Sequence, residues 1–211
     1  MPKRMAVLLS FVVLALGCAT LDERVVTTRA ADAERIPTNI AIYPLLTGEA
    51  PVVRGQGRLM LTTNVKDDRI YIVGPAETKL VSNMQSQLLT NLLSAELSRR
   101  KFTVKELPVE MPPEQSNKGG NSFFVSLGTL KYLRDTYALE AILVGNVYFV
   151  SDGGDIGVKA AYLRLVDTTT LNVLCHISIS DGYSGDSMED TARALALALA
   201  KEAKLVATET K

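Results

Sequence analysis

The sequence predicts an α/β fold in which a mixed β-sheet, ending in a C-terminal antiparallel meander, is packed by three amphipathic helices. Three observations lead to this fold class. Apolar residues recur at three- and four-residue intervals in three separate stretches, as they do on the buried face of a helix. Short alternating or continuous apolar runs, which are typical of strands, stand between these stretches. The last three runs are joined by tight turns, so we expect them to pair as antiparallel hairpins.

The first half of the mature chain is expected to place strands before one long helix. Residues 39–46 are apolar enough for a first strand, and Pro44 indicates an edge or a strand end because proline cannot donate to a ladder. Weaker strand signals follow at 58–62 and 69–73. A stripe of leucines then predicts a helix over 77–99.

The second half is expected to hold two more helices and four strands. In chain order these are a strand at 102–107, a helix from Phe123 to just before Leu139, three meander strands at 141–150, 157–166 and 171–181, and a closing helix from Ser187 to Val206. Ser187 and Asp190 have the spacing of a capping box, so the closing helix is expected to begin at Ser187.

The composition excludes several classes of function. The 23 Lys+Arg balance 23 Asp+Glu, which argues against a nucleic-acid partner because neutralising phosphates requires a basic surface. A single histidine, His176, excludes a multi-histidine metal site and most histidine-based catalysis. Asp152 and Asp155 supply too few oxygens for calcium, and no Gly-Lys-Ser/Thr sequence is present to hold a phosphate. We therefore expect no enzyme activity, no catalytic residue, no cofactor and no bound metal.

The first eighteen residues carry the strongest functional signal. Lys3 and Arg4 precede an apolar run at 5–17, which are the charged and hydrophobic regions of a secretory signal. The run is shorter than the roughly 20 residues that span a bilayer. It ends in Ala-Leu-Gly at 15–17 followed by Cys18, which resembles the lipobox of bacterial lipoproteins.

The lipobox resemblance implies that residues 1–17 are a signal peptide and that Cys18 becomes the lipidated first residue of the mature protein. Attachment through three acyl chains, such as palmitate, is nearly permanent, because each buried methylene contributes about 0.8 kcal/mol. Ala19, standing where an Asp would retain the protein, implies transfer to the outer membrane, facing the periplasm. Inner-membrane retention, a plain cleaved secretory signal and an uncleaved span are the alternatives.

The mature chain is expected to divide into a tether at 18–38 and a single α/β domain at 39–211. The tether contains scattered charge and little apolar periodicity, and it ends near Pro37. No internal repeat divides the domain further.

Lipidation of Cys18 leaves Cys175 without a partner in an oxidising compartment, so its thiol is expected to be buried. The alternation around Cys175 supports this, because it stands on the apolar face of a strand and His176 stands on the opposite, half-exposed face. The apolar face is predicted to comprise Leu171, Val173, Cys175, Ile177 and Ile179.

Three segments of the chain resemble the FlgO-type flagellar assembly lipoproteins. They are a helix-to-strand passage at 87–104, a strand with its approach at 137–148 and a hairpin at 163–174. The similarity covers residues 39–180 together with the lipobox, and its motifs are structural. Related folds occur in curli secretion channel lipoproteins and in lipoproteins that stimulate penicillin-binding proteins.

The resemblance implies an outer-membrane lipoprotein with a structural role in flagellar assembly, stability and motility. It would act by tethering and protein docking, with further flagellar outer-membrane or periplasmic ring proteins as partners and further copies of the chain as an additional possibility. Two alternatives stay open. A secretion-channel subunit would need a membrane-spanning hairpin, which only residues 54–74 could supply. An activator of a peptidoglycan synthase would have to reach across the periplasm on its tether.

Overall fold

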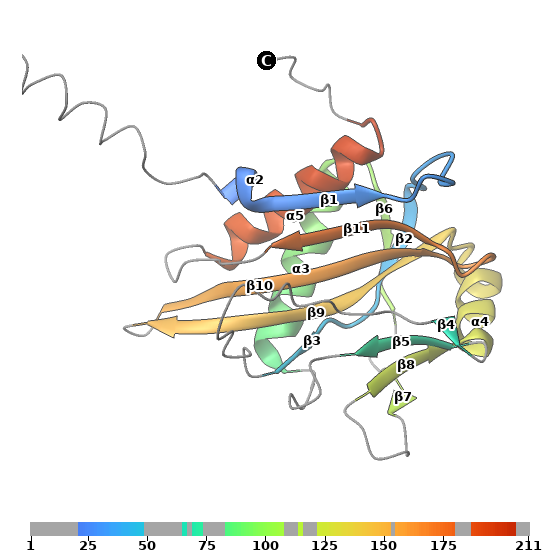
Figure 1. Cartoon of the computed structure of the whole chain (residues 1–211), viewed down its shortest axis with the longest axis horizontal. Helices are drawn as coiled ribbons and strands as arrows, with labels where there is room; N and C mark the ends of the chain where they lie inside the picture. The colour runs from blue at the N-terminus through green and yellow to red at the C-terminus, as the bar shows by residue number, and fades with distance from the viewer. Residues whose placement is uncertain are drawn as a thin grey trace, which may run out of the picture.

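The structure is a computed structural model that describes residues 21–48, 65–66, 69–73, 83–107, 114–115, 122–152, 155–179 and 187–205 (Figure 1). The helices of this part of the chain are α2 (Leu21–Arg24), α3 (Met84–Arg99), α4 (Leu127–Tyr137) and α5 (Met188–Glu202). The strands are β1 (Val25–Arg29), β2 (Asn39–Ile42), β3 (Leu46–Thr47), β4 (Val65–Lys66), β5 (Arg69–Val73), β6 (Thr103–Lys105), β7 (Glu114–Gln115), β8 (Ser122–Ser126), β9 (Ala141–Asp152), β10 (Asp155–Asp167) and β11 (Val173–Ile179).

Seven strands form the main sheet, in the order β1-β11-β10-β9-β2-β6, with β3 paired to β9 beyond β2. Strands β9, β10 and β11 make an antiparallel meander, whereas β2 is parallel to both β6 and β9. The expected α/β fold with a mixed sheet and a C-terminal meander is confirmed. Because β2 is an interior strand that ends at Ile42, Pro44 marks a strand end and not a sheet edge.

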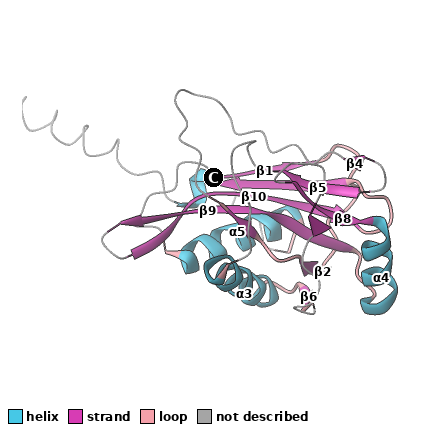
Figure 2. Ribbon diagram, turned by 90° about the horizontal axis from the view of Figure 1, so that it is seen from below, coloured by secondary structure: helices cyan, strands magenta, loops and turns pink. Residues whose placement is uncertain are grey.

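The helices lie on both faces of the sheet because the two connections between parallel strands cross the sheet in opposite directions. From β2 the chain passes through α3 to β6 on one side of β2, and from β6 it passes through α4 to β9 on the other side. Right-handed crossovers then require the two helices to cover opposite faces. Figure 2 shows α3 and α5 side by side in a layer beneath the strands, with α4 at one end.

Each face of the sheet buries its own hydrophobic cluster. The larger cluster joins α3 and α5 to the sheet through residues such as Leu89, Leu93 and Leu195. The smaller cluster joins Leu130 and Leu133 of α4 to β2, β8 and β9. Each of these leucines is at most 1% exposed, so the amphipathic stripes read from the sequence are the buried faces of the helices.

The helix starts follow from capping side chains. The Oδ1 of Asn83 accepts from the backbone N–H of Ser86 at 2.9 Å at the start of α3, and the Oγ of Ser187 accepts from the N–H of Asp190 at 3.0 Å at the start of α5. The start expected at Ser187 is therefore confirmed. The helix expected over 77–99 begins instead at Met84, because the extended Asn83 caps it, and residues 77–82 lie outside the described residues.

The small sheet corrects one helix boundary. Its order is β4-β5-β8-β7, and β5 confirms the strand expected at 69–73. The helix expected to begin at Phe123 begins instead at Leu127, because residues 122–126 pair with β5 as strand β8. Ser126 then caps α4 by accepting from the N–H of Thr129. The strand expected at 58–62 lies outside the described residues.

The stretch expected to be a tether contains an edge strand. Strand β1 pairs with β11 over its whole length, with Val25 opposite Ile179 and Arg29 opposite Cys175. Alternate residues of β1 are exposed, since only one face of it lies on the larger cluster. Strand β1 contains two valines and two threonines in five residues, and these residue types favour strands. The segment is too short to show a clear alternation of apolar and polar residues.

A β-bulge corrects the predicted face of β11. Cys175, Ile177 and Ile179 are buried in the larger cluster as expected. Leu165 is opposite Cys175, but the next residue of β10, Val166, is opposite Val173, so Leu174 is an extra residue. The bulge turns Val173 toward the smaller cluster, and Leu171 packs there too.

Gly145 allows β9 and β10 to approach closely, and its replacement by alanine is expected to destabilise the fold. A Cβ at this position would lie 2.1 Å from the carbonyl oxygen of Tyr162 and 2.9 Å from the Cα of Leu163. These are backbone atoms of a central strand, so Gly145→Ala should lower the free energy of unfolding by about 3 kcal/mol or more. Urea denaturation followed by circular dichroism measures the change.

Gly128→Ala in α4 is the matched control. A Cβ there would meet nothing closer than the Oγ of Ser126 at 3.8 Å. Alanine in a helix interior is favoured over glycine by about 0.5 to 1 kcal/mol, so this variant should be as stable as the wild type or more so. Equal stability of both variants would contradict the close approach at Gly145.

The thiol of Cys175 is expected to be unreactive in the native protein. Cys175 is fully buried, and burial raises the pKa of its thiol to about 12, with a contribution from the Glu202 carboxylate. A thiol reagent at pH 8 should therefore label the protein only after denaturation, because the thiolate is the reactive form. Rapid labelling of the native protein would contradict this, and the Cys175→Ala variant controls for any free thiol at Cys18.

Candidate functional site

The expected lipidation site, Cys18, lies three positions before the first residue that the structure describes. Cys18 and the signal peptide expected at 1–17 lie outside the described residues, which begin at Leu21. Leu21 packs against the larger cluster, and α2 runs directly into β1. Only two residues separate Cys18 from Leu21, so their Cα atoms lie within about 11 Å of each other even when the chain is fully extended.

A groove runs between β1 and α5, beside this first packed segment. Its volume is about 300 Å³. Thr27 on β1 and Glu202 on α5 bridge its walls, with the Oγ1 of Thr27 donating to the Oε1 of Glu202 at 2.7 Å. The groove is lined by Val25, Thr27, Ala194, Leu197, Ala198, Lys201 and Glu202. Its main polar groups therefore fasten the edge strand to the helix.

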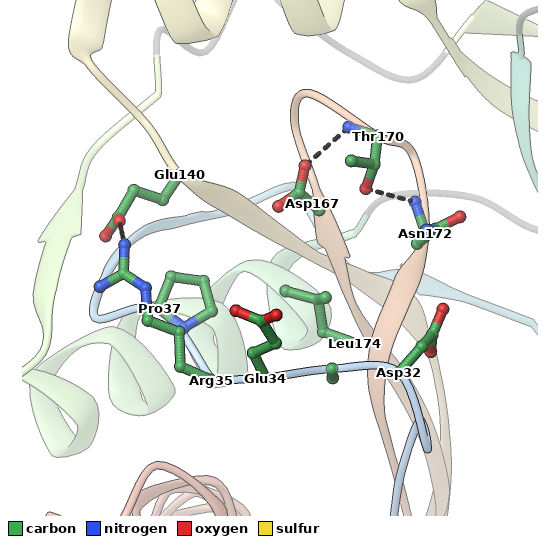
Figure 3. Close-up of a pocket in the computed structure, with 10 residues that line it drawn as sticks. Asp32, Glu34, Arg35, Pro37, Glu140, Asp167, Thr170, Asn172 and Leu174 are labelled. Carbon is green, nitrogen blue, oxygen red and sulfur yellow. Dashed lines mark hydrogen bonds and ion pairs between the residues drawn. The ribbon is translucent and has the colours of Figure 1, made fainter.

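A second, polar pocket lies where the chain between β1 and β2 passes the turn between β10 and β11 (Figure 3). Its volume is about 290 Å³. Arg35 forms an ion pair with Glu140 across it. The Oδ1 of Asp167 accepts from the backbone N–H groups of Thr169 and Thr170, each at 2.7 Å. These contacts hold the loop and the turn in place, and they account for Arg35, Glu140 and Asp167.

Arg164 and His176 lie directly opposite each other on β10 and β11. The Nε of Arg164 donates to the Nδ1 of His176 at 3.1 Å, so the proton of the neutral imidazole is on Nε2. Burial, together with the Arg164 charge, lowers the pKa of His176, and burial lowers the pKa of Arg164 to about 10. At pH 7 the pair therefore carries one positive charge, on Arg164.

The sequence predicted the exposure of His176 but not its contact with Arg164. His176 is exposed, as expected from the alternation along its strand. Arg164 stands on the outward face of its own strand by the same alternation, but no role for it follows from that position alone. The register of β10 and β11 brings the two together. Because the Nδ1 of His176 already accepts from Arg164, that nitrogen is occupied and is not free to act as a general base.

Two further kinds of site were sought in the described ranges of the chain. No group of three or more His, Cys, Asp and Glu side chains is arranged there to hold a metal ion. None of the helices in those ranges combines the length and apolar character needed to cross a bilayer.

Comparisons with known proteins give a distant structural likeness. No family model matches the sequence, and no curated protein matches it. The PelC dodecamer from Paraburkholderia phytofirmans is 14% identical, with a TM-score of 0.45 over 88% of this chain and 98% of that chain. A variant of the same dodecamer is 12% identical, with a TM-score of 0.45 over 86% of this chain and 96% of that chain. At this TM-score the likeness carries no conclusion about function.

The depressed pKa of His176 predicts a specific loss of stability in acid. The unfolded chain protonates this imidazole near its ordinary pKa, whereas the folded state resists protonation beside Arg164. The unfolded state therefore binds more protons below about pH 6.5, and the free energy of unfolding falls as the pH drops from 7 to 5. His176→Gln should flatten this part of the pH profile. Thermal unfolding of both proteins at matched pH values tests it, and identical profiles would contradict it.

Proposed function

We propose that this chain is an outer-membrane lipoprotein with a structural role in flagellar assembly, stability and motility. The observation that carries the proposal is the lipobox-like sequence at 15–18, followed within three residues by Leu21, which packs against the larger cluster. The resemblance of residues 39–180 to the FlgO-type lipoproteins supports the flagellar assignment. We propose a docking role without catalysis, with Cys18 as the modified residue.

The short connection to the membrane defines how the protein works. The acyl chains on Cys18 confine the domain to the membrane surface, which raises its effective concentration for partners that are held at the same surface. Since β1 is part of the sheet, almost no free chain separates the lipid from the domain. The domain therefore sits close to the bilayer and meets partners located there.

The same geometry disfavours an activator of a peptidoglycan synthase. Such a lipoprotein has to reach away from the outer membrane, and a free tether over 18–38 would span at most about 70 Å. Pairing of β1 with β11 removes most of that length, because the chain is already fixed to the domain from Leu21. Only the connection from Cys18 to Leu21, which spans at most about 11 Å, remains to extend the domain away from the membrane.

A secretion-channel subunit has less support for a related reason. The hairpin it would need falls within residues 54–74, where β4 and β5 pair antiparallel with Lys66 opposite Arg69. The second edge of β5 is hydrogen-bonded to β8 of the domain along five residue pairs. Strand β5 is therefore already paired on both edges within the small sheet, which disfavours its use in a membrane-spanning hairpin.

The test uses the producing bacterium. Deletion of the gene should reduce swimming and the number or anchorage of flagellar filaments, and the full-length chain should restore both. A version that carries a cleavable secretory signal in place of residues 1–18 delivers the same domain without lipid, and it should fail to restore them. Mass spectrometry of the mature N-terminal peptide should find Cys18 acylated.

Two results would contradict the proposal separately. Normal swimming with normally anchored filaments after deletion would remove the flagellar role. An unmodified thiol at Cys18 in protein purified from the bacterium would remove the lipid anchor.

A further inference from the structure

Strand β1 forms one end of the main sheet in the described part of the chain, so its outer edge faces away from β11. The backbone N–H of Ala30 donates to the carbonyl oxygen of Leu174 at 3.0 Å, which shows how the ladder continues toward β1. In an antiparallel pair, residues that bond to the neighbouring strand alternate with residues whose N–H and C=O groups point the other way. Val25, Thr27 and Arg29 therefore direct their backbone groups toward the outer edge.

The groove between β1 and α5 lies beside this outer edge. Val25 and Thr27, which line it, are two of the residues whose backbone groups point outward. Figure 1 shows α5 running alongside β1, and the hydrogen bond from Thr27 to Glu202 ties the strand to the helix. A strand added at the outer edge would direct every second side chain into the groove, because side chains alternate between the two faces of a sheet.

The helix wall of the groove is apolar, accessible to solvent and positively charged at one end. Leu197 and Ala198 of α5 are half-buried, so both present apolar surface to the groove. Lys201 lines the groove about one turn further along α5 and is exposed. The carboxylate of Glu202 accepts from Thr27, so the ammonium of Lys201 is the charge that the groove offers to a ligand.

These features fit an extended segment of a protein. Outward N–H and C=O groups at every second residue of β1 are the partners that another extended backbone requires. An apolar groove beside such an edge accommodates alternate side chains of the added strand and gives specificity. A carboxylate on the same segment, placed beside Lys201, supplies the complementary charge.

A second copy of this chain fits the groove less well. A two-fold contact repeats the same surface on both sides, so it would bring two Lys201 side chains into one interface. Like charges that meet in an interface oppose binding, whereas a carboxylate is attracted to the same ammonium. The charge of the groove therefore favours a different protein with an acidic, extended segment.

We propose that the groove docks an extended segment of a partner protein. The segment pairs with the outer edge of β1 at Thr27, places an apolar side chain against Ala198 and places a carboxylate beside Lys201. The inference rests on the proposed docking function and names its surface. Because α2 runs directly into β1, the groove lies close to the proposed lipid anchor and within reach of partners held at the membrane.

A photoreactive side chain in the groove locates the partner segment. In the producing bacterium, p-benzoylphenylalanine replaces Leu197 in the full-length chain, and irradiation joins it to the protein that lies in the groove. Peptide mass spectrometry should map the cross-link to one short segment of another protein, with an Asp or Glu close to the joined residue. The same replacement of Tyr132 on α4, at a position that is 48% exposed, is the control and should not give that cross-link.

A synthetic peptide that spans the cross-linked segment is the probe for strand pairing. At about ten times its Kd, it should slow hydrogen exchange at the outward amides of Thr27 and Arg29 by about tenfold. The amide of Thr28, which the ladder directs toward β11, should change little. Nuclear magnetic resonance measures each amide separately, and pairing along the outer edge predicts this alternation.

Two variants at position 27 separate the backbone contact from the side chain. Thr27→Pro removes the outward N–H, which an edge strand tolerates because that group points away from β11. Thr27→Val keeps the N–H and loses the hydroxyl that binds Glu202. The peptide should bind Thr27→Pro about fivefold or more weakly than Thr27→Val, because one backbone hydrogen bond is lost.

Lys201→Gln tests the carboxylate of the partner segment. An exposed ion pair contributes little, so this variant should bind the peptide about two- to fivefold more weakly than the wild type does. The difference should shrink at high salt, because salt screens exposed charges. Thermal unfolding must first show that all three variants fold as the wild type does.

Four outcomes would overturn the inference. They are no cross-link from position 197 beyond that of the Tyr132 control, a cross-link to another copy of this chain, equal protection of neighbouring amides in β1, and equal binding of the peptide to folded Thr27→Pro and Thr27→Val. If Thr27→Pro does not fold, the amide measurement on the wild type decides. None of these outcomes affects the proposed function, which fails through Cys18 or through the deletion phenotype.

Discussion

Strand β9 is the constraint on which the rest of the structure depends. Every residue from 141 to 148 is buried, and the strand is hydrogen-bonded to β10 on one side and to β2 and β3 on the other. Leu143 faces the cluster with α3 and α5, whereas Val144 faces the cluster with α4. Both hydrophobic clusters and both kinds of strand pairing therefore meet in this one strand, and Gly145 lets its neighbour approach without a clash.

The pairing of β1 with β11 links the fold to the proposed function. Without that pairing, the chain after Cys18 would be a tether, and the domain could work at a distance from the membrane. With it, the lipid proposed on Cys18 would be separated from the sheet edge by only a few residues, which suits the proposed docking to partners held at the bilayer surface. The strand extends the sheet and, in the proposed function, also determines how far the domain lies from the membrane.

Polar groups in this molecule fall into two kinds, separated by whether the fold itself satisfies them. Glu140, Asp167 and Glu202 all have partners within the described chain, so their place is explained by local structure. Within the described part of the chain, the hydrogen-bond partner of Arg164 is the neutral imidazole of His176.

Local periodicity in the sequence determined the fold class, the meander, the start of α5 at Ser187, the burial of Cys175 and the exposure of His176. These features depend on which face of one element is apolar, and that information lies within a few consecutive residues. Tertiary structure decided the rest. Val25 finds its partner, Ile179, at the other end of the chain, residues 122–126 extend because β5 lies beside them, and Val173 changes face at a bulge. The contact of Arg164 with His176 likewise depends on the register between two strands, and register is set by packing against both clusters at once.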